Sequence, residues 1–129
     1  MGILQKLFGK NEDSGEDLPI TLDVEKRKAQ LLRLEKGLDA LVASMREDPA
    51  QLAKPGWKAR VDEYGRLAGE AMMQRGKPLT REALLDLVFE VRPVFTGTIP
   101  PGMERIAPLQ DEVMAAANDL QEVLPGERG

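Results

Sequence analysis

The feature that most constrains the fold is a seven-residue apolar repeat between Leu22 and Glu47. Apolar side chains recur at the first and fourth positions of each heptad, the spacing that lines one face of an α-helix. Only Arg27 interrupts the repeat, and Pro49 stops the helix from continuing. The repeat predicts a long helix whose apolar stripe packs on other helices or on a second chain. The stripe consists of Val24, Leu31, Leu34, Leu38, Leu41 and Met45.

Three later segments also repeat apolar residues at helical spacing, and turn-forming residues separate them. No segment shows the sustained alternation of apolar and polar residues that is typical of a strand. The sequence therefore predicts an all-α fold, a small bundle of about four helices with a long first helix. The later segments run from Trp57 to Met72, from Thr80 to Val91 and from about Leu109 to Leu124. A start of the last helix near Met103, with a kink at Pro108, is the alternative. The expected core residues are Leu31, Leu34, Leu38, Leu41, Trp57, Val61, Tyr64, Leu84, Leu87, Val88, Val113, Ala117 and Leu120.

The distribution of charge divides the chain into parts. Residues 11–17 contain four acidic side chains and no apolar one, so they cannot bury apolar area, and we interpret them as a flexible acidic linker. The linker separates residues 1–10 from a bundle domain that we place at residues 18–125. Residues 126–129 are interpreted as a C-terminal tail.

Helix lengths and charges indicate how the helices pack. At about 1.5 Å per residue the first helix spans about 39 Å, whereas residues 81–92 span about 18 Å and residues 109–124 about 24 Å. We therefore expect part of the first helix to extend beyond these two helices. Either a second chain, as in a twofold homodimer, or the second helix with its preceding segment would cover the exposed leucines. Residues 54–77 contain six basic and three acidic side chains, and residues 103–129 contain two basic and six acidic ones. This difference favours packing of the second helix near the fourth.

The composition argues against several classes of function. The chain contains no His and no Cys, so the commonest proton shuttle and the main ligands of zinc, copper and iron are missing. No glycine-rich phosphate-binding loop occurs, and we expect no cofactor. The net charge of −4 gives no general attraction for phosphate backbones, so we expect no nucleic-acid partner. We predict a non-enzymatic adaptor or assembly subunit that binds a protein partner.

One pattern supports an enzyme as the alternative. Glu82, Asp86 and Glu90 follow each other at intervals of four residues, which places three carboxylates on one helical face. Carboxylate oxygens suit Mg²⁺, so the alternative function is a small magnesium-dependent all-α hydrolase or transferase. A solvent-exposed helix face explains the same spacing without a metal, and we favour that interpretation.

Residues 1–10 form the segment that most suggests a docking role. On a helix their apolar side chains would lie on one face, with the lysines away from it. A helix this short is marginal in water, so it should form only against a surface. A groove on a partner protein, an anionic membrane surface and the chain's own domain are the candidate surfaces, and we favour the partner protein. The docking residues are Ile3, Leu4, Leu7, Phe8, Lys6 and Lys10.

The hydropathy pattern bears on location. No apolar run approaches the roughly 20 residues of a membrane-spanning helix, and the first residues lack the apolar stretch of a secretory signal. We expect a cytoplasmic protein, either free, peripheral at a membrane or bound to a larger assembly.

Overall fold

The computed structural model describes residues 22–127 and shows an all-α fold, as predicted. The docking residues predicted within residues 1–10 lie outside the described range. No strand occurs between residues 22 and 127, and four of the five helices there correspond to the predicted ones. The helices are α1 (Val24–Met45), α2 (Pro49–Leu52), α3 (Pro55–Arg75), α4 (Arg81–Glu90) and α5 (Ile106–Gln121). None of the helices in this part of the chain is long and apolar enough to cross a membrane.

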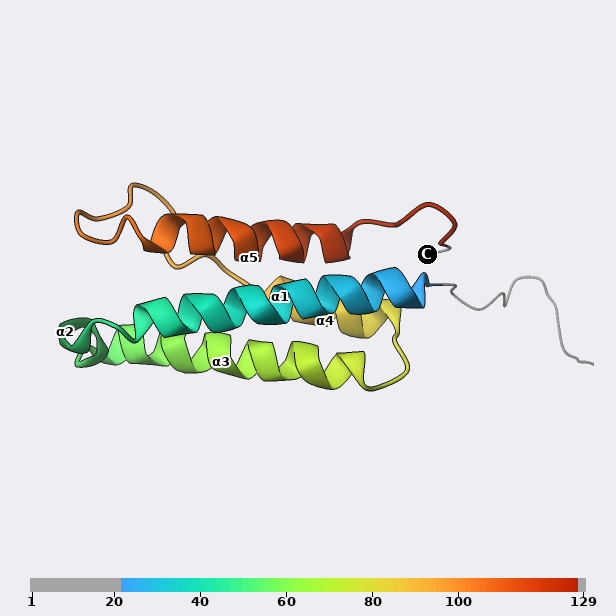
Figure 1. Cartoon of the computed structure of the whole chain (residues 1–129), viewed down its shortest axis with the longest axis horizontal. Helices are drawn as coiled ribbons and strands as arrows, with labels where there is room; N and C mark the ends of the chain where they lie inside the picture. Colours follow the sequence, from blue (N-terminus) through green and yellow to red (C-terminus); the bar gives the residue numbers. More distant parts are fainter. Residues whose placement is uncertain (1–21, 128–129) are drawn as a thin grey trace, which may run out of the picture.

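Helix α1 lies in the middle of the bundle (Figure 1). Helix α3 packs along one side of α1 and α5 along the other, while α4 packs against α5 and α3. The expectation that α3 packs near α5 because of their opposite charges is wrong, since α1 separates them. Burial of leucine side chains outweighs the attraction between exposed charges in determining which helices pack together. Burying one leucine contributes about 1.5–3 kcal/mol, whereas an exposed ion pair contributes about 0.2–1 kcal/mol.

Local capping signals set most helix boundaries. The side chain of Asp23 accepts a hydrogen bond from the Lys26 backbone N–H (3.2 Å), so α1 begins at Val24, two residues later than the repeat suggested. The Thr80 hydroxyl accepts one from the Ala83 N–H (3.1 Å) and starts α4. Helix α5 begins at Ile106, whose side chain is fully buried. This start lies between the expected one at Leu109 and the alternative near Met103.

The apolar stripe of α1 is buried within the monomer. Leu31, Leu34 and Leu38 are 0% exposed, because α3 has 21 residues against 22 in α1 and covers it along most of its length. Of the two ways of covering the long first helix, the structure shows the second helix, α3, in this position, so the stripe needs no second chain to bury it. Among the stripe residues only Val24 is exposed, at 43%. The predicted core residues are buried except for Trp57, which is partly buried and donates a hydrogen bond from Nε1 to the Met45 carbonyl (2.9 Å).

Arg27, which interrupts the apolar repeat, is also fully buried. Its guanidinium forms an ion pair with Glu127, whose side chain is 2% exposed, and Arg27 Nε donates to Glu127 Oε2 (2.8 Å). The same guanidinium donates to the carbonyl of Leu120 (3.1 Å) and to that of Glu122. Because the carbonyls at the end of a helix carry partial negative charge, Arg27 also stabilises the C-terminal end of α5. Glu127, which we placed in the C-terminal tail, thus packs against the first turn of α1.

Candidate functional site

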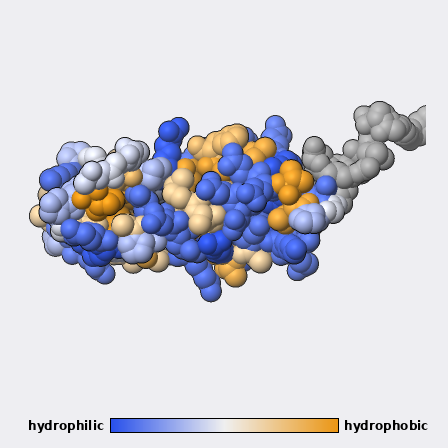
Figure 2. All heavy atoms as spheres, turned by 90° about the horizontal axis from the view of Figure 1, so that it is seen from above, coloured by the Kyte–Doolittle hydropathy of each residue, from blue (hydrophilic) through white to orange (hydrophobic). Residues whose placement is uncertain are grey.

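Two grooves on the bundle are candidates for a functional site. The first, the α1–α5 groove, is an open and mainly apolar hollow of about 490 Å³ on the outer side of α1. Seen over α5, the surface of the molecule shows separate hydrophobic patches in largely hydrophilic surroundings (Figure 2). The groove is lined by Ala29, Leu32, Arg33, Lys36, Gly37 and Ala40 from α1 and by Glu112 from α5.

Small side chains form much of the α1–α5 groove. Ala29 and Ala40 are exposed, and Leu32 is 36% exposed although it belongs to a core helix. At Gly37 the two helices come close, since a Cβ there would lie 3.3 Å from Val113 Cγ2. Short residues at helical spacing let another helix approach α1 without displacing long side chains.

Charged side chains line one edge of the α1–α5 groove. Arg33 Nε donates to Glu112 Oε2 (2.7 Å), and Arg33 Nη1 also pairs with Asp119. The hydrogen bond with Glu112 raises the pKa of Arg33, and it lowers the pKa of Glu112. Lys36 is exposed and has no acidic partner within 4 Å among residues 22–127. The groove therefore presents one positive charge that is not neutralised by the described residues.

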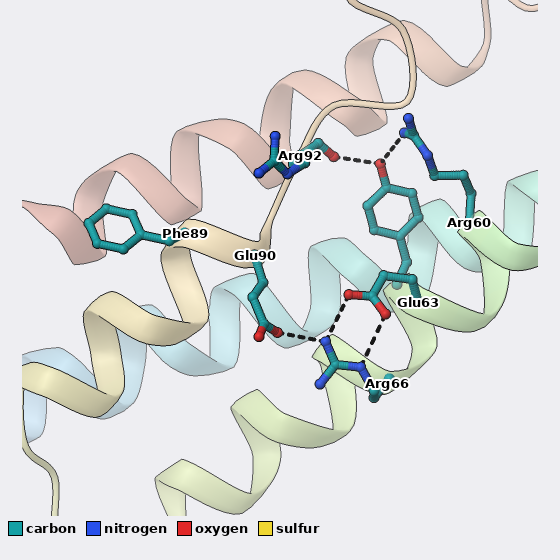
Figure 3. A pocket seen from close by; sticks show the side chains of 7 residues that line it. Arg60, Glu63, Arg66, Phe89, Glu90 and Arg92 are labelled. Atoms are coloured by element: carbon teal, nitrogen blue, oxygen red, sulfur yellow. Dashed lines mark hydrogen bonds and ion pairs between the residues drawn. The ribbon is translucent and has the colours of Figure 1, made fainter.

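The second candidate, the α3–α4 groove, consists of two neighbouring basins that share Arg66 and Glu90. The first basin, of about 310 Å³, is shown in Figure 3. The second basin has about 270 Å³. Besides the shared pair, the first basin is lined by Arg60, Glu63, Tyr64, Phe89 and Arg92, and the second by Glu70, Gln74, Ala83, Asp86 and Leu87.

A three-residue ion cluster separates the two basins. Arg66 of α3 donates to Glu63 (2.8 Å) on the same helix and to Glu90 (2.6 Å) at the end of α4 (Figure 3). The hydrogen bonds with Glu63 and Glu90 raise the pKa of Arg66, and the one with Arg66 lowers the pKa of Glu63. One basic side chain is thus shared by two acidic ones at this point.

In the first basin, α3 holds the chain that leaves α4. The Tyr64 hydroxyl donates to the Arg92 carbonyl (Figure 3). Arg60 Nη1 donates to the Pro93 carbonyl (2.8 Å). Burial raises the pKa of Tyr64, so its hydroxyl stays protonated and remains a donor. The guanidinium of Arg92 has no hydrogen-bond or ion-pair partner among the residues that the structure describes. Hydrogen bonds from α3 thus hold the backbone at the first basin, which is basic at its edge.

The second basin is acidic and contains an unpaired acceptor. Glu70 and Asp86 line it from α3 and α4. Gln74 is 6% exposed, and its Nε2 donates to the carbonyl of Ala83 (3.1 Å) and to Glu70 (3.2 Å). Its Oε1 is buried and accepts no hydrogen bond within the described part of the protein. A donor that reached this atom would therefore be favoured.

The carboxylates predicted on one helical face lie on α4, but they do not converge. Asp86 and Glu90 line the second basin, whereas Glu82 is exposed elsewhere on α4. Glu90 is paired with Arg66. Between residues 22 and 127 no group of three or more acidic residues is arranged to hold a metal ion.

Sequence reasoning missed the basic residues of the α3–α4 groove and the small residues of the α1–α5 groove. Arg60, Arg66 and Arg92 lie on two elements and give no sequence motif. Alanine is the strongest helix former, so Ala29 and Ala40 on a predicted helix gave no sign of a binding surface. A signal that could have indicated this surface is Phe89, an aromatic residue on the polar side of α4, which is 60% exposed.

Comparison of the chain with protein-family models, with curated proteins and with solved structures found no match in any of the three.

Proposed function

We propose that the protein is a non-enzymatic adaptor or assembly subunit that binds an amphipathic helix of a partner protein in the α1–α5 groove. The observation that carries this proposal is an apolar groove on the outside of a bundle whose leucine core is already closed. A monomer gains nothing from exposing Leu32 beside Ala29 and Ala40, and exposed apolar hollows rimmed by polar residues are typical of binding surfaces.

The length and charge of the groove define the helix that would fit. From Ala29 to Ala40 the groove follows twelve residues of α1, a rise of about 16 Å, or three turns of a bound helix. The bound helix needs apolar residues at i, i+4, i+7 and i+11 to follow this length. Acidic residues beside its apolar stripe would pair with Lys36, so the preferred partner helix is acidic.

The alternative of a magnesium-dependent hydrolase or transferase has less support. It needs several carboxylates around one ion. Glu90 is paired with Arg66. Asp86 lines the second basin, but Glu82 does not.

Synthetic peptides can test the α1–α5 groove. Two helical peptides of about twelve residues with leucines at i, i+4, i+7 and i+11 would be compared, one flanked by Glu and one by Lys. We expect the Glu-flanked peptide to bind the full chain with a micromolar dissociation constant and the Lys-flanked peptide at least about tenfold more weakly, measured by fluorescence anisotropy. Leu32→Glu should weaken binding of the Glu-flanked peptide at least about tenfold, because it places a charge in the apolar hollow.

Two variants complete this experiment. Lys36→Glu should reverse the preference between the two peptides, whereas Phe89→Ser, on the opposite side of the bundle from this groove, should leave both affinities unchanged. Failure of both peptides to bind, or equal binding to the wild type and to Leu32→Glu, would exclude the groove as the docking site.

Residues 1–10 are proposed as a second docking element. Changing Leu4 and Phe8 to Ser should alter the free energy of unfolding by less than about 0.5 kcal/mol, as for changes outside a core. The same variant should lose the complex that the full chain forms in its native host, while neither protein co-sediments with anionic vesicles. A fall of several degrees in melting temperature would instead place the segment in the core, and vesicle binding by the wild type alone would favour a membrane surface.

A further inference from the structure

We propose that the α3–α4 groove is the interface of a twofold homodimer, in which the basic first basin of one copy faces the acidic second basin of the other. This surface is distinct from the α1–α5 groove, so the proposal is independent of the proposed function. It rests on charge complementarity between the two ends of one groove.

The charges of the groove are arranged around the Arg66–Glu90 ion pair. On the α4 side, Asp86 precedes Glu90 by four residues, about 6 Å along a helix, and Arg92 follows it by two residues of extended chain, about 6–7 Å. On the α3 side, Glu70 follows Arg66 by four residues, and Arg60 precedes it by six. Each side of the groove is therefore positive at one end and negative at the other, with a neutral centre.

A twofold axis through the Arg66–Glu90 pair exchanges the two ends. It brings Asp86 of one copy near Arg92 of the other, and Glu70 near Arg60, and each of these contacts occurs twice. The lining side chains other than the shared pair have a net charge of +1 in the first basin (Arg60 and Arg92 against Glu63) and −2 in the second (Glu70 and Asp86). A second copy of the chain carries the matching order of charges by construction, which makes it the best-fitting occupant.

Polar and apolar groups in the groove fit the same arrangement. A guanidinium that entered the second basin would bring a donor to the region of Gln74 Oε1, the buried acceptor without a partner among residues 22–127. Phe89 of α4 is 60% exposed, and Met73, which shares a face of α3 with Arg66 and Glu70, is 51% exposed. Phe89 lines the first basin and would lose exposed apolar area in a dimer.

The available area indicates a weak dimer. Helix α3 is about 31 Å long, and two adjacent helices present a face about 20 Å wide, so each copy offers about 600 Å² at most. The total of about 1,200 Å² lies at the lower end of specific interfaces. We therefore expect a micromolar dissociation constant that rises at least about tenfold between low and high salt, because exposed charges are screened.

Charge-swap variants of the full chain test this interface. Asp86→Lys and Arg92→Glu each place like charges opposite each other twice in the dimer, so each variant alone should be monomeric in sedimentation velocity at low salt. An equimolar mixture of the two should dimerise again, because Lys at position 86 then faces Glu at position 92 and Asp86 faces Arg92. The chain carrying both changes should also dimerise. Both side chains are exposed, and circular dichroism verifies that each variant folds.

The outcomes separate this interface from the others. Lys36→Glu, in the α1–α5 groove, should leave the dimer unchanged. A wild-type chain that stays monomeric up to millimolar concentration would overturn the proposal, as would single variants that still dimerise or a mixture that stays monomeric. None of these results bears on peptide binding to the α1–α5 groove, which is measured separately.

Discussion

Replacing Arg27 by Met is expected to lower the free energy of unfolding by about 3–5 kcal/mol, because it leaves the buried carboxylate of Glu127 without a positive partner. Arg27 is 0% exposed, and the Glu127 side chain is 2% exposed. The substitution also removes the donors to the carbonyls of Leu120 and Glu122 at the end of α5. Urea unfolding followed by circular dichroism measures the loss.

A matched control and a double variant identify the cause. Lys28→Met changes an exposed lysine one position away and should cost less than about 0.5 kcal/mol. Changing both Arg27 and Glu127 to Met should cost at least about 1 kcal/mol less than changing Arg27 alone, because no buried charge remains unpaired. A loss below about 1 kcal/mol for Arg27→Met would mean that water solvates the Glu127 carboxylate in the variant, so that the loss of its partner costs little free energy.

The same ion pair makes stability depend on acid. The hydrogen bond from Arg27 lowers the pKa of Glu127 from 4.5 to about 2. Since the pKa is lower in the folded state, the stabilisation is fully present above pH 4.5 and is lost as the pH falls toward 2. The difference in unfolding free energy between the wild type and Glu127→Gln should therefore be constant near neutral pH and shrink across this range.

Replacing Leu38 by Ala is expected to lower the free energy of unfolding by about 2–5 kcal/mol. Leu38 is 0% exposed and belongs to the middle of α1, which packs on α3 and α5. Removal of its side chain leaves a cavity that neighbouring helices cannot fully close. For a domain of about 100 residues this corresponds to a melting temperature lower by about 10 °C or more. Thermal unfolding by calorimetry measures the change.

Leu32→Ala is the matched control for Leu38, since it makes the same substitution on the same helix. Leu32 is 36% exposed and lies in the α1–α5 groove, so its truncation leaves no enclosed cavity and should cost less than about 1 kcal/mol. Equal losses of unfolding free energy for the two variants would contradict the structure, in which Leu38 lies on the buried face of α1 and Leu32 on the exposed face.

Local patterns made the helices predictable from the sequence. The seven-residue repeat placed Leu31, Leu34, Leu38 and Leu41 on one face, and all four are buried. Thr80 caps α4, and Gly76 ends α3, as their residue types indicate. Each of these features depends on residues within about one or two helical turns, so its physical cause is contained in a short stretch of sequence.

Partner choice among the helices could not be predicted in the same way. The length of α1 left open whether α3 or a second chain covers it. The charge difference between α3 and α5 is too weak to make them neighbours, because leucine burial contributes more. The sequence left the start of α5 open between Met103 and Leu109, because Ile106 lies just before Pro108 and shows no helical repeat of its own. Its burial depends on contacts with residues far away in the sequence.

The two grooves were likewise beyond sequence reasoning. Gly37 and Glu112 meet because α1 packs on α5, and Arg60 and Arg92 line one basin because the chain after α4 returns to α3. Asp86 and Glu90 were noticed as carboxylates on one face, yet their surroundings, including Arg66, come from another helix. The chemistry of a surface site depends on which helices are neighbours, and local periodicity does not contain that information.

Arg27 shows both sides of this division. The sequence alone determined that it lies on the buried face of α1, because the heptad spacing continues through it. Only the tertiary structure decided that this face is closed at that point by Glu127, 100 residues later in the chain. A charge on an apolar face needs an opposite charge and hydrogen-bond acceptors, and the packing of α5 and the segment after it against α1 determines which residues provide them.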